Sequence, residues 1–439
     1  MKADGYEPSG GGRDEKKDMQ YPLMFRLRQK MHGPTIDDVP AAVEGELSKL
    51  SLGSKVKPRD TVAVTCGSRR IANYATIIKA VVDHFKQLEA KPFLVPAMGC
   101  HGSGTAEGQR EVLHALGITE EIIGAEIRSS METEIIGQLP QGVPVHCDRE
   151  ALNANHTMVV NRVKPHPIFG GKVQSGLLKM IAMGLGNLEG AQIYHRAVEN
   201  TPFEDIARGV YKVMLNKARL LAGLTILDNG QHGSARVQGV LPEDFVEKEN
   251  AALQRARGLV PRLPFKFIDI LLVDEIGTMF GCLGVDSNII GRKYNAHTAA
   301  EGEFPQIRTI VYRDLNPQSQ GNATGVGHAE FVRSRILRKT NATATRLNCL
   351  AIGMPTLAAT PMDFETDREI LDAALTLIGL TPLEKAKIVW IRNTSAIVEF
   401  ECSEPFLEEV QHWKDLSVFS SLHPLDFDSH GNLRDFVVE

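Results

Sequence analysis

The feature that most constrains the fold is an alternation of short apolar runs, glycine-bearing turns and amphipathic stretches that starts near residue 60. An apolar run in DTVAVTCGSRR precedes helical spacing in IANYATIIKAVVDHFKQLEA, and KPFLVPAMGCHGSG is again an apolar run with a turn. A helix is expected over TAEGQREVLHALGI, with Thr105 as its N-cap and Gly117 as its stop. Strand, turn and helix in this repeated order predict a parallel sheet covered by helices.

The pattern restarts in the second half of the chain. FIDILLVDEIGTMFG follows the linker-like ARGLVPRLPFK, and further strands are expected in IRTIVYR, RLNCLAIG and KIVWIRN. Because 439 residues exceed one ordinary core, we predict two α/β domains with mostly parallel sheets, over residues 21–255 and 265–439, with the active site in the crevice between them. Residues 1–20 are polar and glycine-rich, so we expect a disordered leader there and no signal peptide.

Composition excludes several classes of partner. A net charge of -5 gives no basic surface of the kind that binds nucleic acid. The sequence has no run of eighteen apolar residues, so no membrane span is expected. Its six cysteines form no CxxC pair, which favours reduced thiols and a cytoplasmic location.

Three turns carry candidate site residues, because loops after parallel strands converge at one edge of the sheet. They hold Arg69, His101 and His166. A histidine in such a turn is more often structural than catalytic, but the glycines around His101 let backbone N–H groups approach a ligand. His166 lies between two prolines, which indicates a rigid turn and is also the mounting that a general base needs.

Two further candidates follow in the chain. Lys179 lies in the apolar SGLLKMIAMGLG, where its amine either reaches the surface or, if buried, serves as a nucleophile. His195 comes sixteen residues later, in AQIYHRAVEN. Neither residue belongs to an HExxH or paired-histidine metal motif.

Taken in order, these motifs resemble those of the lactate racemase family, which comprises nickel-dependent 2-hydroxyacid racemases and epimerases. CGSRR stands where the family has D-x-T-R-P and keeps Arg69, and AMGCHGSGTAEG is similar to the family's G-x-H turn. VKPHPIFGGKVQSGLLK is similar to the P-H motif with its downstream lysine, and His195 has the spacing of the family's nickel ligand. The resemblance covers about residues 56 to 200.

The resemblance implies a nickel pincer nucleotide, a pyridinium mononucleotide bound through its lysine, here Lys179, as a thioamide. His195 would bind the nickel, and Arg69, Gly99, Ser175 and Gly176 would contact the cofactor. His101 and His166 would act as acid and base on opposite faces of the substrate, while the cofactor takes and returns a hydride. The substrate carboxylate would be bound by Arg69, Arg292 or Lys293.

The same resemblance implies an isomerase whose partners are a small 2-hydroxyacid and the cofactor-synthesis proteins. Neither a nucleic acid nor a membrane is implied as a partner, and a homo-oligomer is left open. The choice between racemase and epimerase is open as well, because the two differ only in whether the substrate has other stereocentres.

Some positions depart from the family pattern and leave alternatives. Cys66 and Arg70 replace the aspartate and the proline of the first motif, and Lys172, in its own FGGK, is a rival to Lys179. The C-terminal half offers only GTMFGCLGVDSNIIGRKY, with Asp286 and Asn288 matching. In place of lactate we therefore expect a larger or differently charged 2-hydroxyacid, for example one derived from a sugar. The alternative function is a nickel-free protein that binds a nucleotide or a phosphorylated metabolite. An ordinary NAD enzyme is disfavoured, since SQGNATGVGHAEF lacks the GxGxxG spacing.

Overall fold

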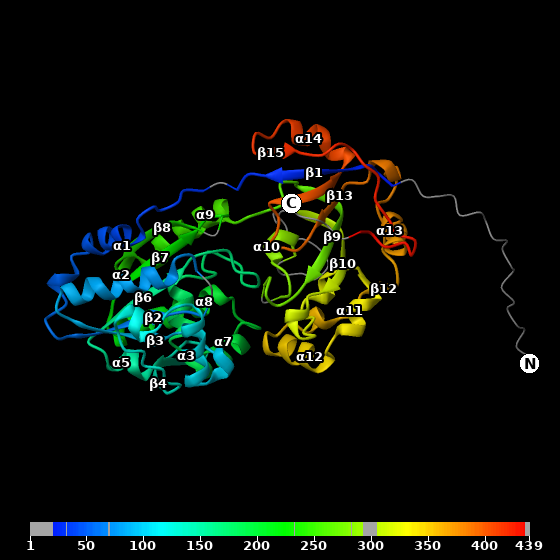
Figure 1. Cartoon of the computed structure of the whole chain (residues 1–439). Helices are drawn as coiled ribbons and strands as arrows, with labels where there is room; N and C mark the ends of the chain where they lie inside the picture. Colours follow the sequence, from blue (N-terminus) through cyan, green and yellow to red (C-terminus); the bar gives the residue numbers. More distant parts are fainter. Residues whose placement is uncertain are drawn as a thin grey trace, which may run out of the picture.

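A computed structural model describes residues 21–31, 33–68, 71–231, 233–281, 283–292 and 305–434. The described chain forms two α/β units, each built on one main sheet, and Figure 1 shows them next to each other. The predicted fold class, α/β with mostly parallel sheets, is confirmed. The predicted leader, residues 1–20, lies outside the described residues.

The first unit has a five-stranded sheet in the order β3-β2-β6-β7-β8, in which only β8 is antiparallel. Its apolar runs are buried from both sides, as parallel strands require; in β2 every residue after Thr61 is buried. The strands are β2 (Thr61–Cys66), β3 (Lys91–Pro96), β6 (His156–Arg162), β7 (Leu220–Asp228) and β8 (Ser234–Val240), with a separate hairpin of β4 (Thr133–Gln138) and β5 (Pro144–Asp148).

Helices cover both faces of this sheet and form a core on each side. One face packs against α1 (Val39–Ser48), α2 (Tyr74–Gln87), α3 (Ala106–Ala115) and α4 (Glu120–Ile123). The other packs against α5 (Arg149–Asn153), α6 (Leu177–Lys179), a π-helix (Met180–Gly184), α7 (Asn187–Ala197), α8 (Phe203–Lys217) and α9 (Phe245–Leu259). The predicted N-cap of α3 is confirmed, since the Thr105 hydroxyl accepts the Gly108 N–H at 3.1 Å.

The second unit has an eight-stranded sheet in the order β12-β11-β10-β9-β13-β14-β1-β15. Its first five strands are parallel, and β14, β1 and β15 add an antiparallel edge. The strands are β1 (Met24–Gln29), β9 (Phe267–Ile276), β10 (Gln306–Leu315), β11 (Phe331–Arg333), β12 (Met362–Phe364), β13 (Ile388–Ile391), β14 (Glu399–Ser403) and β15 (Leu416–Val418). Its helices are α10 (Ser287–Ile290), α11 (Ser334–Lys339), α12 (Ala342–Ala351), α13 (Asp367–Leu375) and α14 (Leu407–Gln411).

The structure departs from the sequence predictions at two elements. Strand β1, from the segment assigned to the N-terminal domain, pairs with β14 and β15 in the second sheet (Figure 1). The expected strand in RLNCLAIG is wrong, because this segment belongs to α12, whose N-cap Asn341 accepts the Ala344 N–H at 3.1 Å. The leucines of that run, Leu347 and Leu350, are 65% and 66% exposed, so they do not fill a sheet core.

The chain passes twice between the two units, after β1 and after α9. Among the described helices, none has the length and apolar character needed to cross a membrane. The five cysteines in the described ranges form no disulfide.

Candidate functional site

A pocket of about 260 Å³ lies at the carboxyl ends of β2, β3 and β6. Residues 280, 281, 285 and 286, which follow β9 in the second unit, complete its wall. Both units therefore contribute to the pocket, and it contains six of the predicted site residues: Gly99, His101, His166, Ser175, Lys179 and His195. The structure brings these residues together from segments nearly one hundred residues apart.

The closest pair in the pocket is His166 and Lys179. Nε2 of His166 lies 2.6 Å from Nζ of Lys179, and the ammonium position is 5.5 Å from the centre of the Phe169 ring. The imidazole itself stacks on Phe169 at 4.4 Å with an interplanar angle of 10°. This stacking and the flanking prolines hold the ring in one orientation against the lysine.

The hydrogen bonds of His166 determine where its proton lies. Nδ1 accepts the backbone N–H groups of Ile168 and Phe169, both at 3.1 Å, so that nitrogen carries no proton. The proton of the neutral ring is therefore on Nε2, as assigned from these contacts, and it points to the Lys179 amine. In this arrangement the amine accepts a hydrogen bond, which requires its neutral form, and a neutral amine is a nucleophile.

His101 occupies the turn after β3. Ser68, from the turn after β2, hydrogen-bonds its Nδ1. Gly99 just before it has φ +62, and its carbonyl accepts the Gln109 side-chain N–H at 2.9 Å. A side chain on Gly99 would lie 3.0 Å from the Met183 carbonyl oxygen, so glycine is needed where this turn meets the π-helix.

His195 projects from α7 into the same pocket. Burial lowers the pKa of His195, and the Lys179 amine, when charged, lowers it further. The imidazole is thus neutral at neutral pH, which is the form that binds a metal. Within the described ranges, no three side chains of histidine, cysteine, aspartate or glutamate gather as a metal site. A metal bound at His195 would therefore need most of its other ligands from a bound group.

The segment before Lys179 is fixed by two contacts. The Ser175 hydroxyl accepts the Lys164 N–H at 2.8 Å and donates to the Lys164 carbonyl at 2.5 Å. Gly176 has φ +96, and a Cβ there would lie 2.6 Å from a carboxylate oxygen of Glu249. Ser175 lines the pocket, whereas Gly176 packs behind it against α9.

Glu249 is a residue of the site that the sequence reasoning missed. Its carboxylate comes from α9, is 1% exposed and accepts the Leu178 N–H at 3.0 Å at the start of the helix that carries Lys179. Burial raises the pKa of Glu249 to about 8, although the hydrogen bonds from Leu178 and Leu177 oppose the rise. The carboxyl group is therefore mostly protonated in the folded chain at neutral pH.

We expect Glu249→Gln to reduce the loss of stability toward alkaline pH. The folded pKa of about 8 exceeds the ordinary value of 4.5, so the stabilisation is complete below pH 4.5 and is lost as the pH rises through 8. The loss amounts to at most about 5 kcal/mol, and an uncharged glutamine avoids it. Thermal unfolding from pH 5 to 9 would measure it, with the exposed Glu247→Gln on the same helix as the control. Parallel pH profiles of wild type and Glu249→Gln would contradict this account.

Four of the sequence candidates are not among the described residues that line the pocket. Arg69 and Lys293 lie outside the described residues. Arg292 is 1% exposed and does not line the pocket; it donates to Glu330 at 2.8 Å and to the Ile307 carbonyl at 3.1 Å. These contacts favour a structural role, so the structure does not support Arg292 as a substrate cation. Lys172 is exposed and also lies off the pocket.

The faint motif of the C-terminal half does reach the pocket. Asp286 lines it and caps α10, accepting the Asn288 N–H at 2.9 Å, and the Ser287 hydroxyl donates to the Pro167 carbonyl at 2.9 Å. That last bond joins the second unit to the turn that carries His166. Ser287 therefore joins the two units at the pocket, while Asp286 fixes the start of α10 beside it.

Comparison with known proteins gives a family match and similar solved structures. Residues 29–206 match the family model described as the lactate racemase N-terminal domain. The structure of the lactate racemase apoprotein from Thermoanaerobacterium thermosaccharolyticum is similar with a TM-score of 0.52 at 14% identity, over 88% of this chain and 96% of that one. A crystal structure of a protein from Thermotoga maritima gives a TM-score of 0.48 at 13% identity, over 65% of this chain and 72% of that one.

No curated protein matches the chain. At 14% identity the likeness to the apoprotein shows the fold, and the family match covers the segment that holds His101, His166, Lys179 and His195. Residues 29–206 of the chain are thus similar to the N-terminal domain of lactate racemases.

Proposed function

We propose that this chain is an isomerase that inverts C2 of a 2-hydroxyacid, as a racemase or epimerase dependent on a nickel pincer nucleotide tethered to Lys179. The observation that carries the proposal is the gathering of Lys179, His101, His166 and His195 in one pocket between the two units. The match of residues 29–206 to the lactate racemase N-terminal domain supports the same reaction class.

The donor set of the pocket fits such a cofactor. His195 offers one neutral imidazole and Lys179 one amine, and the described residues add no cluster of three metal-binding side chains. A group that brings its own soft ligands to nickel and needs one imidazole from the protein matches that set. Lys179 would hold the group covalently and His195 would bind the metal. When bound, the group supplies the acceptor for the C2 hydrogen.

The contact with His166 favours formation of a covalent bond at the Lys179 amine. The Nε2–H of His166 at 2.6 Å stabilises the neutral amine, whose lone pair is needed to form an amide-type bond. The two N–H groups that bind Nδ1 of His166 fix that tautomer. The Phe169 ring covers the other side of the pair and limits access of water.

The histidines would handle the hydroxyl proton. We assign His101, held at Nδ1 by Ser68, as the base that takes the proton from the substrate hydroxyl as C2 becomes a ketone. We assign the Nε2–H of His166 as a hydrogen-bond donor to the same hydroxyl oxygen when the 2-hydroxyacid binds with that oxygen on the His166 side of the pocket. Inversion requires the C2 hydrogen to return to the opposite face of the planar ketone, and the other histidine would return the proton to the oxygen. Lys164 lines the pocket and would supply positive charge for the substrate carboxylate, as would the proposed Arg69.

An isotope experiment tests this proposal. The cofactor-loaded chain is incubated in D2O with one enantiomer of a 2-hydroxyacid, and the product is examined at C2 by NMR. We expect inversion with the original hydrogen retained at C2, because that hydrogen leaves and returns with its electron pair. Incorporation of deuterium at C2 would show proton abstraction and would contradict the proposed reaction; no inversion with any hydroxyacid would contradict the function.

A further inference from the structure

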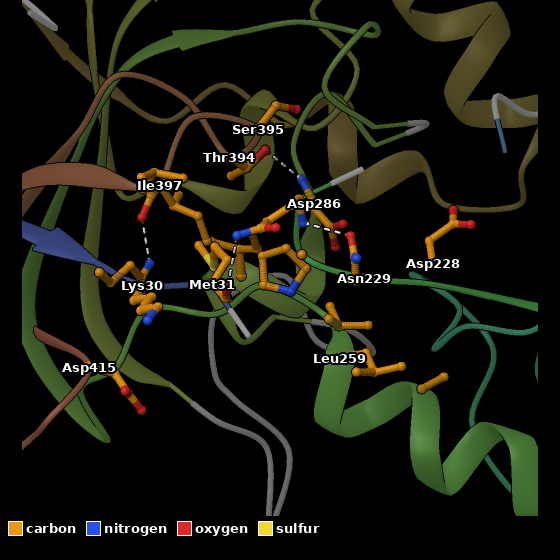
Figure 2. Close-up of a pocket in the computed structure, with 18 of the residues that line it drawn as sticks. Lys30, Met31, Asp228, Asn229, Leu259, Asp286, Thr394, Ser395, Ile397 and Asp415 are labelled. Carbon is orange, nitrogen blue, oxygen red and sulfur yellow. Dashed lines mark hydrogen bonds between the residues drawn. The ribbon is translucent and has the colours of Figure 1, made fainter. Parts of the chain in front are cut away.

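A second and larger cavity, of about 730 Å³, lies between the two units where the chain passes from one to the other. It is lined by Met31, after β1, and by Leu259, at the end of α9, so both crossings of the chain border it. Figure 2 shows Lys30, Thr394 and Ile397 of the second unit around it, together with Asp228 and Leu259 of the first. We call it the hinge cavity.

The hinge cavity adjoins the catalytic pocket. Arg162, Lys164 and Asp286 line both. Two of these residues are held firmly: Arg162 is paired with Asp228 at 2.5 Å, and the backbone of Lys164 exchanges two hydrogen bonds with Ser175. A ligand whose carboxylate lies near Lys164 can therefore extend into the hinge cavity without displacing the catalytic side chains.

The lining of the hinge cavity combines an apolar surface with an excess of positive charge. Apolar side chains line much of its wall: Met31, Leu259, Val260, Ile289, Ile397 and Val398. Among the described residues, five basic side chains, namely Arg28, Lys30, Arg162, Lys164 and Lys414, stand against three carboxylates, Asp228, Asp286 and Asp415. Arg28 is also paired with Glu399 at 2.6 Å, which leaves an excess of one positive charge. That excess suits a substrate that extends one further carboxylate into the cavity across an aliphatic middle section.

The volumes of the two cavities indicate where the part of the substrate beyond C2 would lie. The catalytic pocket of about 260 Å³ is below the roughly 300 to 1,000 Å³ of ordinary small-molecule sites, yet the proposed function requires it to hold a cofactor and the reacting carbon. The adjoining 730 Å³ is within that range. The adjoining hinge cavity therefore offers the room for the rest of the substrate that the pocket itself lacks.

We infer that the hinge cavity is a specificity subsite, and that the substrate is an elongated 2-hydroxyacid with an aliphatic spacer and a distal carboxylate. This inference rests on the proposed function for the position of C2. Lys30 would attract the distal carboxylate, and Leu259 and Ile397 would contact the spacer.

Calorimetric titration of the cofactor-free chain tests the subsite without requiring turnover. The probes are 2-hydroxyadipate, 2-hydroxyhexanoate of the same length with one charge fewer, and lactate. We expect 2-hydroxyadipate to bind about tenfold more tightly than 2-hydroxyhexanoate, and lactate to bind most weakly. Equal binding of the three acids would overturn the inference.

Matched variants locate the binding site. Lys30→Ala is expected to remove most of the preference for the second carboxylate, and Leu259→Trp, which reduces the cavity volume, should weaken both long acids more than lactate. Lys212→Ala, exposed on α8 and away from both cavities, is the control and should change none of the affinities. Unchanged preference in both cavity variants would also overturn the inference.

The two proposals can fail separately. Loaded chain that inverts lactate but shows no preference for 2-hydroxyadipate would keep the proposed function and reject the subsite. Tight binding of 2-hydroxyadipate that depends on Lys30, with no inversion of any hydroxyacid, would keep a diacid site and reject the racemase.

Discussion

Lys179→Arg is expected to lower the rate of 2-hydroxyacid inversion roughly a thousandfold or more, because removal of a covalent centre costs most of the catalysis that depends on it. Arginine keeps roughly the length of the side chain, but its guanidinium stays protonated and forms no amide-type bond. It would also place a second donor against the Nε2–H of His166, which is now 2.6 Å from Nζ. The rate of inversion and the nickel content of the purified chain measure the effect.

Lys172→Arg is the matched control. Lys172 follows the turn of His166 but is exposed and does not line the pocket; only its backbone N–H is engaged, with Glu204 at 2.7 Å. This variant should keep its rate and its nickel. The reverse result, with Lys172→Arg inactive and Lys179→Arg active, would move the tether to Lys172.

The second large effect is expected for His101→Asn. Loss of an acid–base group lowers the rate by about 10² to 10⁴, and cofactor loading should be unaffected because the ring of His101 is bonded to Ser68 and not to the lysine. His166→Asn, by contrast, should reduce both rate and loading, since His166 stabilises the neutral amine of Lys179. Rates and the mass of the lysine-containing peptide separate the two cases.

His412→Asn, on the exposed surface after α14, is the control for both histidine variants and should resemble wild type. If His101→Asn retained the full rate, or lost the cofactor as His166→Asn does, the assignment of His101 as the base would be wrong.

Much of the fold follows from local sequence pattern. The apolar runs of β2, β3, β6 and β9 are buried strands because both faces of a parallel sheet are covered, and such runs are visible in the sequence. The position of β1 was not predictable in this way. Its pairing with β14 joins Met24 to Ser403, and no local pattern specifies a partner so distant in the chain. A strand was wrongly predicted in the α12 segment because a short apolar run fits a strand or a helix equally well.

The site was predictable where turns follow strands. His101, His166 and Lys179 lie in one pocket because the loops after β3 and β6 open at the same edge of the sheet. Arg292 was predicted to bind the substrate, because a charged residue in a weak sequence motif gives no information about its burial. In the structure its buried guanidinium donates hydrogen bonds to backbone carbonyls instead. The position of Glu249 could have been predicted from the sequence. It lies four residues after Phe245 and therefore on the apolar face of α9, where a buried carboxyl group needs a hydrogen-bond partner.

The measurement that tests the central claim most directly is peptide mass spectrometry with nickel analysis of the chain produced together with cofactor-synthesis proteins. A tethered cofactor predicts a nucleotide-sized addition on the peptide that contains Lys179 and about one nickel per chain. An unmodified Lys179 and no nickel, in cells where a related racemase is loaded, would contradict the claim. The pocket of His101, His166 and His195 would then be the binding site of a different ligand.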